Sequence, residues 1–174
     1  MKKIVLIGPE CTGKSTLAES LARHYEAPWV PEYAREYINK LDRPYKAEDL
    51  LEIAKGQLQS EDEYAKEAKE LLICDTDLRV IKIWEEYKYG QCSSEILDEI
   101  KSRKYDLYLF TNIDIPWEPD PLRENENSRD FLYGLYQKEL SEQEVPVVEI
   151  KGSFYERKRK ATEAIDNLLI KVTR

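Results

Sequence analysis

The pattern of apolar and polar positions predicts short buried strands that alternate with amphipathic helices. The first apolar run, Ile4-Val5-Leu6-Ile7, precedes a segment from Leu17 to Tyr25 in which leucine and alanine recur at helical spacing. Further strands are expected at 28–30, 71–77, 105–111 and 145–150, and further helices at 46–71 (one helix or a pair), 78–88, 93–103, 130–140 and 155–172. Such alternation is typical of an α/β fold, so we expect three α/β/α layers around a mainly parallel sheet of about five strands.

The connection between the first strand and the first helix carries the clearest motif. It reads Gly-Pro-Glu-Cys-Thr-Gly-Lys-Ser from Gly8 to Ser15 and matches G-x-x-x-x-G-K-[ST], the loop whose backbone amides surround nucleotide phosphates. Lys14 is expected to reach the β- and γ-phosphates, and the hydroxyl of Ser15 to ligate Mg²⁺. The alternative is a chance glycine turn, but all four fixed positions would match by chance in roughly one per cent of chains this long. We therefore predict a P-loop NTPase that binds ATP and Mg²⁺ through Gly8, Glu10, Cys11, Thr12, Gly13, Lys14, Ser15 and Thr16.

Length and composition narrow the classes of protein that fit this motif. The 174 residues suit one domain, 1–174, and 41% of them are apolar and occur in periodic runs, although 36% are charged. A net charge of −8 argues against a nucleic-acid partner, because phosphate backbones are bound by basic surfaces. We interpret the one basic cluster, residues 157–160, as the solvated face of a helix. Nothing in the pattern indicates the oligomeric state.

The cysteine and histidine content and the lengths of the apolar runs indicate the cellular compartment. The three cysteines form no C-x-x-C pair, which suits a reducing environment, and with a single histidine they cannot build a cysteine-histidine zinc site. No apolar run approaches the roughly 20 residues needed to span a bilayer. We expect a cytoplasmic protein without a membrane partner.

Acidic residues follow the second and third predicted strands, at the end of the sheet where α/β proteins bind ligands. Glu32, Tyr33 and Arg35 come directly after residues 28–30 and are expected to handle substrate, although a charged helix start capped by Glu32 is the alternative. Asp75 ends the apolar run that begins at Leu71 and is expected to orient Mg²⁺ together with Ser15. Apolar runs that end in aspartate are also common without a metal.

The segment 112–129 is expected to form a lid. Its prolines 116, 119 and 121 prevent regular structure, and Arg123 and Arg129 accompany Trp117 and Asp120. A mobile cover of this kind excludes water, and its arginines neutralise charge that develops on a transferred phosphoryl group. The alternative is an inert surface loop. Earlier in the chain, Trp84 and Tyr87 are most simply core residues, and a place at the base of the substrate cleft is the alternative.

The ordered motifs together resemble those of a known family. They are the P-loop with Glu10, the block 32–37, Asp75-Thr76-Asp77, and Pro116-Trp117 followed by Asp120 and Leu122-Arg123. This set resembles the ribosylnicotinamide kinase domain of the bacterial NadR-type NAD-salvage proteins over nearly the whole chain. The resemblance implies a P-loop small-molecule kinase that transfers the γ-phosphate of ATP to the 5′-hydroxyl of nicotinamide riboside, which gives nicotinamide mononucleotide in NAD biosynthesis.

The same resemblance assigns roles to individual residues. It implies that Glu32 and Asp77 face the acceptor and that Arg123 and Arg129 close over the phosphates, while the base stays open among Glu32, Asp75 and Asp77. The Gly152-Ser153 turn lies where small P-loop kinases contact adenine. The predicted catalytic residues are Lys14, Glu32, Asp75, Arg123 and Arg129, and the predicted substrate-binding residues are Trp29, Glu32, Tyr33, Arg35, Asp77, Trp117 and Asp120.

Two departures from the family bear on the acceptor and on the extent of the activity. Pro31 stands where the family has a tryptophan suited to stacking on a pyridine ring, and Trp29, two residues earlier on the same face of a strand, is the expected substitute. Fuller members carry an adenylyltransferase domain before the kinase, so we do not expect complete NAD synthesis from this chain. The alternatives are a kinase of another nucleoside or of a nucleoside monophosphate, and a regulatory ATP-binding P-loop ATPase.

Overall fold

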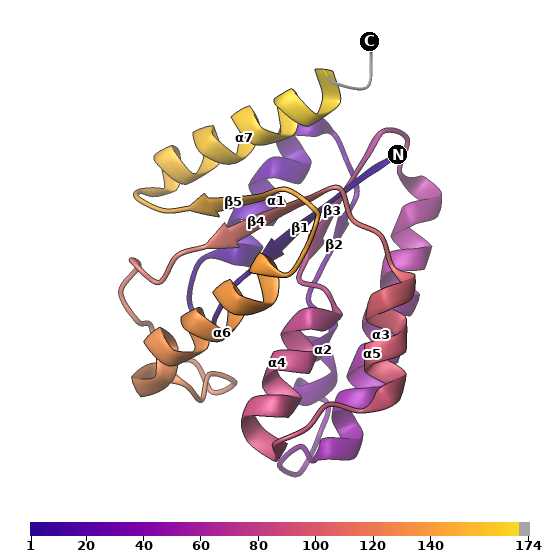
Figure 1. Cartoon of the computed structure of the whole chain (residues 1–174), viewed down its shortest axis with the longest axis vertical. Helices are drawn as coiled ribbons and strands as arrows, with labels where there is room; N and C mark the ends of the chain where they lie inside the picture. The colour runs from indigo at the N-terminus through magenta and orange to yellow at the C-terminus, as the bar shows by residue number, and fades with distance from the viewer. Residues whose placement is uncertain (171–174) are drawn as a thin grey trace.

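Five parallel strands form the centre of the protein, in the order β2-β3-β1-β4-β5 (Figure 1). The computed structural model describes residues 1–170. The strands are β1 (Lys2–Ile7), β2 (Trp29–Val30), β3 (Leu71–Asp75), β4 (Leu107–Thr111) and β5 (Val147–Ile150). The helices are α1 (Lys14–Tyr25), α2 (Tyr33–Asn39), α3 (Ala47–Glu67), α4 (Leu78–Tyr89), α5 (Ser94–Ser102), α6 (Arg129–Ser141) and α7 (Phe154–Ile170), with a short 3₁₀ helix, η1 (Glu126–Ser128).

The central strand β1 is buried from Ile4 onward because both of its faces are covered. Ile4 and Leu6 point into a core with α1 and α7, and Val5 and Ile7 point into a second core on the opposite face, beneath α4 and α6. Figure 1 shows the helices on the two sides of the sheet accordingly, with α1 and α7 apart from the other helices. This alternation follows from the period of two along a strand, and continuous apolar runs are typical of parallel strands covered on both sides.

A third apolar cluster joins helices α2 to α5. Leu50 and Ile53 of α3 are fully buried there, together with Ile81 of α4 and Ile96 of α5. Gly90 ends α4 in the left-handed conformation, and the side chain of Ser93 caps α5 by accepting a hydrogen bond from the N–H of Ile96. This helical cluster lies at the edge of the sheet formed by β2, and its helices α2 and α4 border the candidate site described below.

The fold matches the expected α/β architecture, and the sheet is parallel throughout. The segment 46–71 contains one helix, α3, rather than two. The end of the predicted lid is helical, because η1 occupies Glu126–Ser128 and α6 begins at Arg129. Residues 112–125 contain no helix or strand, as their prolines predict. The predicted end of the last helix at Val172 lies outside the described residues. Within residues 1–170, no helix has the length and apolar character needed to cross a bilayer.

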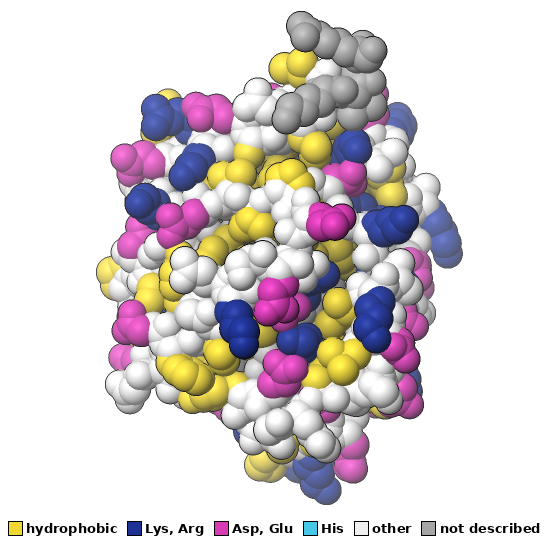
Figure 2. All heavy atoms as spheres, in the orientation of Figure 1, with side chains coloured by type: hydrophobic (Ala, Val, Ile, Leu, Met, Phe, Trp, Pro, Cys, Tyr) yellow, Lys and Arg dark blue, Asp and Glu magenta, His cyan; other side chains and the backbone are white. Residues whose placement is uncertain are grey.

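The basic cluster at 157–160 does not form a uniform solvated face. Arg157 is 3% exposed because its guanidinium turns inward from α7, whereas Lys158, Arg159 and Lys160 remain at or near the surface. On the face drawn in Figure 2, lysine and arginine side chains are interspersed with aspartate and glutamate.

Candidate active site

The P-loop connects β1 to α1 and is shaped by two glycines. Gly8 has φ 149°, and a Cβ atom there would lie 2.5 Å from Oγ1 of Thr111 and 2.8 Å from its carbonyl oxygen, so only glycine permits the close approach of β4. Gly13 has φ 75° and precedes α1 without a side-chain cap, which leaves the N–H groups at the start of the helix without a side-chain partner. The hydroxyl of Thr12 bonds to the carbonyl of Pro9 at 2.9 Å and to Oγ1 of Thr111 at 2.7 Å. The loop is thereby held open around a central cavity.

Lys14 places its ammonium group at the centre of this loop. Its Nζ donates to the carbonyl oxygens of Gly8 at 3.0 Å and Pro9 at 2.8 Å. A cation held by backbone carbonyls above a helix N-terminus creates positive potential at the position where phosphate oxygens bind in P-loop proteins. The geometry is therefore suited to a polyphosphate.

Asp75 ends β3 directly beside the P-loop. Its side chain is 1% exposed, and Oδ1 has no hydrogen-bond partner among the described residues. Burial and, next, the nearby charge of Glu32 raise its pKa to about 6, while Lys14 and the hydroxyl of Ser15 oppose the rise. A buried, unsatisfied carboxylate oxygen near a hydroxyl fits a hard divalent cation such as Mg²⁺. Residues 1–170 contain no cluster of three or more His, Cys, Asp or Glu for a metal, so these two residues would need phosphate oxygens or waters as further ligands.

Glu32 faces the same cavity from the start of α2. It occupies the N-cap position, but its side chain makes no capping hydrogen bond, so the alternative of a purely structural cap does not hold. Glu32 lines the pocket together with Lys14 and Ser15. Two carboxylates, Glu32 and Asp75, thus lie close enough for the charge of one to raise the pKa of the other.

Asp77 lies elsewhere than the resemblance implied. It is 1% exposed and caps α4, where it accepts hydrogen bonds from the backbone and side chain of Arg79 at 3.0 and 2.9 Å and from the hydroxyl of Tyr108 at 2.8 Å. It does not line the pocket. The reason is the intervening Thr76, whose φ of 78° turns the chain so that Asp77 points into the protein behind α4.

Trp29 also lies away from the pocket. It packs against the core shared by α1 and α7, opposite Val30 of the same strand. A residue of β2 on that face of the sheet is separated from the cavity by the sheet itself, so Trp29 does not replace the stacking tryptophan of the family. Tyr33 does not line the pocket either, because its ring packs against Gly56 of α3.

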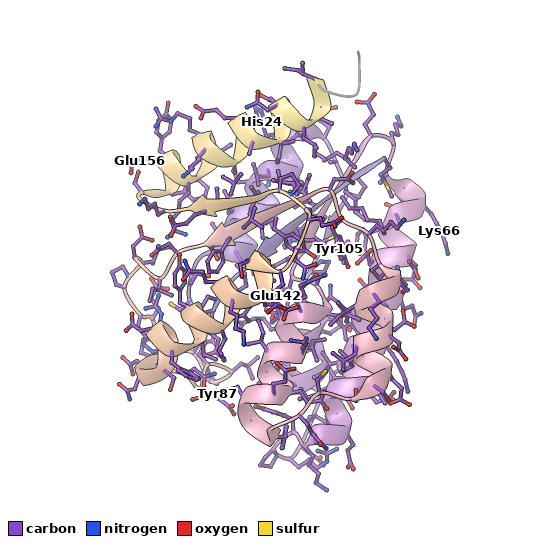
Figure 3. The ribbon with its side chains drawn as sticks, viewed as in Figure 1. His24, Lys66, Tyr87, Tyr105, Glu142 and Glu156 are labelled. Atoms are coloured by element: carbon purple, nitrogen blue, oxygen red, sulfur yellow. The ribbon has the colours of Figure 1, made fainter. Side chains whose placement is uncertain are left out.

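Aromatic and aliphatic side chains form the end of the pocket beyond Glu32. Trp84 and Tyr87 of α4, interpreted above mainly as core residues, line this cavity, and Tyr87 is 39% exposed. In Figure 3 the labelled Tyr87 lies on the side of α4 toward α6, and its ring is 5.9 Å from that of Phe131. The pocket-lining residues beyond the P-loop are Glu32, Ala34, Arg35, Ile38, Val80, Ile83, Trp84, Tyr87, Leu122, Arg123, Asn125, Leu132 and Tyr136.

The lid residues contact the P-loop directly. The carboxylate of Glu10 accepts hydrogen bonds from the N–H groups of Glu124 at 3.2 Å and Asn125 at 3.1 Å. The Sγ of Cys11 accepts from the N–H of Glu118 at 3.2 Å and from Nη1 of Arg123 at 3.3 Å. The segment 116–125 therefore lies over the P-loop, as expected of a lid.

The two lid arginines differ in position. Arg123 lines the pocket, whereas Nη2 of Arg129 donates to the carbonyl oxygens of Cys11, Ile113 and Ile115 at 3.1–3.2 Å. Both guanidinium groups lie near the ring of Trp117, at 6.0 Å for Arg123 and 5.7 Å for Arg129. Arg129 thus joins the start of the lid to the P-loop.

Two further contacts hold the lid to the part of the cavity lined by α2 and α4. Arg35 pairs with Asp120 at 3.0 Å. Glu124 accepts hydrogen bonds from the hydroxyl of Tyr45 at 2.8 Å and from Lys88 at 3.1 Å, and the same hydroxyl accepts from Nε1 of Trp84 at 2.8 Å. The lid is therefore connected through Tyr45 to an aromatic wall of the pocket.

Arg157 supports the P-loop from outside the pocket, a role that the sequence pattern did not indicate. Its guanidinium donates to the carbonyl oxygens of Thr12 at 2.8 Å, Asn112 at 3.1 Å and Gly152 at 2.9 Å, and it pairs with Asp114. It thus joins the P-loop to the loops that follow β4 and β5. The sequence contains four consecutive basic residues here, and nothing in that run distinguishes the one that faces inward.

Comparison with known proteins identifies the family and the fold. A family model described as "AAA domain" matches residues 3–157. The trifunctional NAD biosynthesis/regulator protein NadR of Salmonella typhimurium is 26% identical over 164 residues, and that of Escherichia coli K12 is 25% identical; each alignment covers 90% of this chain and 40% of the relative. The chain therefore spans less than half the length of the curated relatives it matches.

Solved structures show the same likeness. NadR in complex with NR superposes with a TM-score of 0.75 at 25% identity, over 96% of this chain and 49% of that chain. The thymidylate kinase of Candida albicans, at 14% identity, covers 95% of this chain and 91% of its own with a TM-score of 0.67, which shows the fold alone. The predicted resemblance to NadR is confirmed: the chain has the fold of P-loop small-molecule kinases and belongs to the AAA domain family whose model it matches from residue 3 to residue 157.

Proposed function

We propose that this protein is an ATP-dependent kinase that phosphorylates the 5′-hydroxyl of nicotinamide riboside. The observation that carries the proposal is the placement of Glu32 in one cavity between the P-loop with Lys14 and an apolar, aromatic end. A phosphoryl donor at the P-loop and a nucleoside with its base at the aromatic end would bring a hydroxyl to Glu32. The likeness to NadR in complex with NR supports the choice of acceptor.

The reaction needs alignment and charge neutralisation more than covalent chemistry. The oxygen of the acceptor hydroxyl forms a bond to the γ-phosphorus, the bond from that phosphorus to the oxygen of ADP breaks, and the hydroxyl proton passes to a base. Glu32 is the base in this proposal, because it faces the pocket, whereas Asp77 is engaged by Arg79 and Tyr108. Lys14 and Arg123 stabilise the charge on the phosphate oxygens.

In this proposal Mg²⁺ binds beside the P-loop. Ser15 and Asp75 would hold Mg²⁺, which supplies positive charge to the β- and γ-phosphates when bound. Asp75 suits this role better than that of the base, since its Oδ1 is buried and has no hydrogen-bond partner among residues 1–170. The lid excludes water through its contacts with Glu10 and Cys11.

Measurement of ATP consumption with Mg²⁺ against a panel of nucleosides and nucleoside monophosphates tests the proposal. Nicotinamide riboside should stimulate consumption, and Lys14→Ala should remove the stimulation while the far-ultraviolet circular dichroism stays unchanged. Stimulation by a different nucleoside would replace the acceptor but keep the kinase. ATP hydrolysis without stimulation by any acceptor would favour the regulatory ATPase.

A further inference from the structure

The backbone on both sides of Glu32 is held by one buried side chain of α3. The amide of Gln57 accepts a hydrogen bond from the N–H of Tyr33 at 2.8 Å and donates one to the carbonyl oxygen of Pro31 at 3.4 Å. Gln57 is 3% exposed. The two bonds define one orientation of the amide, because only its oxygen can accept and only its nitrogen can donate. Glu32 is thus bracketed by residues that Gln57 fixes.

A glycine next to Gln57 adds a steric constraint. Gly56 lies inside a helix of 21 residues, where glycine is unfavourable. A Cβ atom at this position would lie 2.0 Å from Cε1 of Tyr33 and 2.4 Å from two further atoms of its ring. The missing side chain therefore lets the ring of Tyr33 rest on the helix backbone.

The carboxylate of Glu32 has no comparable support of its own. Its side chain makes no capping bond to α2, and among residues 1–170 none donates a hydrogen bond to the carboxylate. The position of this carboxylate in the pocket consequently follows from the backbone of 31–33. That backbone is set by Gln57 through two hydrogen bonds and by Gly56 through the packing of Tyr33.

We infer that Gln57 and Gly56 are positioning residues that hold Glu32 at the reacting hydroxyl of the acceptor. Neither residue lines the pocket, so both act through Glu32. The inference rests on the proposed function insofar as Glu32 meets an acceptor there. It adds that the geometry of the acceptor side depends on a helix outside the cavity, whereas the P-loop side depends on β1 and β4.

The kinetic test uses a double-mutant cycle on the full chain. Gln57→Met keeps the length of the side chain but removes both hydrogen bonds, and Gln59→Met, at an exposed position of the same helix, is the matched control. We expect Gln57→Met to lower kcat with the acceptor by about tenfold or more, with the KM for ATP changed less than about twofold, and Gln59→Met to change neither. In the Glu32→Gln background, Gln57→Met should have little further effect, because the two residues act as one unit. Equal losses in the two backgrounds would overturn the inference.

A second measurement does not require the acceptor to be known. Hydrogen exchange of the Tyr33 amide, followed by NMR, should accelerate in Gln57→Met and not in Gln59→Met. Gly56→Ala keeps both hydrogen-bonding groups and should lower kcat by displacing the ring of Tyr33, which keeps the test valid if Gln57→Met folds poorly. Unchanged exchange at Tyr33 in Gln57→Met would contradict the inference by itself. Accelerated exchange at Tyr33 without turnover of any acceptor would confirm that Gln57 holds the backbone beside Glu32. It would count against the proposed function instead.

Discussion

The carboxylate of Glu10, in the P-loop, accepts a hydrogen bond of 3.1 Å from the backbone N–H of Asn125, in the lid. The N–H of Glu124 donates to the same oxygen at 3.2 Å. Burial raises the pKa of Glu10, and the two lid N–H groups oppose that rise because they stabilise the ionised form. The loop that holds phosphate and the cover above it are therefore joined by one carboxylate.

Removal of this carboxylate should loosen the lid. Hydrogen bonds to a charged group contribute about 1.5–3 kcal/mol, so the amides of Glu124 and Asn125 should exchange roughly ten to a hundred times faster in Glu10→Ala. Glu10→Gln, which keeps one acceptor oxygen, should give an intermediate rate. The ratio of phosphoryl transfer to ATP hydrolysis should be highest in the wild type, lower in Glu10→Gln and lowest in Glu10→Ala, because an open lid admits water.

Glu19→Ala is the control for this prediction. Glu19 pairs with Arg23 on the outer surface of α1, away from the lid, so its removal should leave exchange in the lid unchanged. Equal exchange rates at Asn125 in the wild type and in Glu10→Ala would refute the proposed connection between the loop and the lid.

Asp75 should make the stability of the nucleotide-free protein depend on pH. Burial and the charge of Glu32 raise its pKa from 3.8 to about 6, so the folded state favours the protonated form. This contribution is present below pH 4 and is lost as the pH rises through about 6. Asp75→Asn should therefore be more stable than the wild type at pH 7.5, by about 3 kcal/mol at most, and by much less at pH 4.

Urea unfolding at the two pH values measures this difference. The same variant should lose phosphoryl transfer, since an amide is a poor ligand for Mg²⁺ compared with a carboxylate. Thermal stabilisation by ATP with Mg²⁺, but not by ATP with EDTA, should decrease in Asp75→Asn. Equal destabilisation of Asp75→Asn at both pH values would show that folding does not raise the pKa of Asp75.

The aromatic wall of the pocket can be tested with a pair of tryptophans. Stacking of a base on an aromatic side chain contributes about 1–3 kcal/mol, so Trp84→Ala should raise the KM for the acceptor roughly five- to 150-fold. Trp29→Ala should lower the stability through the lost packing against α1 and leave this KM unchanged. A raised KM for the acceptor in Trp29→Ala, with no change in Trp84→Ala, would instead show that Trp29 contacts the acceptor.

Asp77 should behave as a structural residue. Asp77→Ala removes the carboxylate that pairs with the buried guanidinium of Arg79 at 2.9 Å, although Glu139 still pairs with that guanidinium at 3.6 Å. It also removes the cap of α4, so we expect a loss of about 2–4 kcal/mol in the free energy of unfolding. Asp77→Asn keeps the capping oxygen and should lose less. For the variant that folds, a normal KM for the acceptor is expected, and a selective rise in that KM would indicate contact with the substrate.

The elements of the fold and the P-loop end of the candidate site could be predicted because their signals are local. The period of hydrophobic positions predicts each strand and helix, and the spacing of Gly8, Gly13 and Lys14 predicts the loop that the structure contains. The position of Asp75 beside that loop could be predicted because the residue ends a buried strand. In each case the sequence neighbours decide the environment.

The other end of the candidate site, beyond Glu32, could be predicted only in part, because tertiary contacts decide which way its side chains point. Asp77 lies two residues from Asp75, but the positive φ of Thr76 and the guanidinium of Arg79 turn it inward. Trp29 faces α1 because β2 lies at the edge of the sheet with that face covered. The inward turn of Arg157 depends on carbonyl groups from three loops far apart in the sequence.

The most direct test of the central claim is the identification of the reaction product. The protein is incubated with Mg²⁺, nicotinamide riboside and ATP labelled with ³²P at the γ-position, and the products are separated and characterised by ³¹P NMR. We predict that the label appears in a phosphate monoester at the 5′ position of nicotinamide riboside, in the wild type and not in Lys14→Ala. Label found only in inorganic phosphate, at equal rates with and without nicotinamide riboside, would contradict the assignment of this site as a nucleoside kinase.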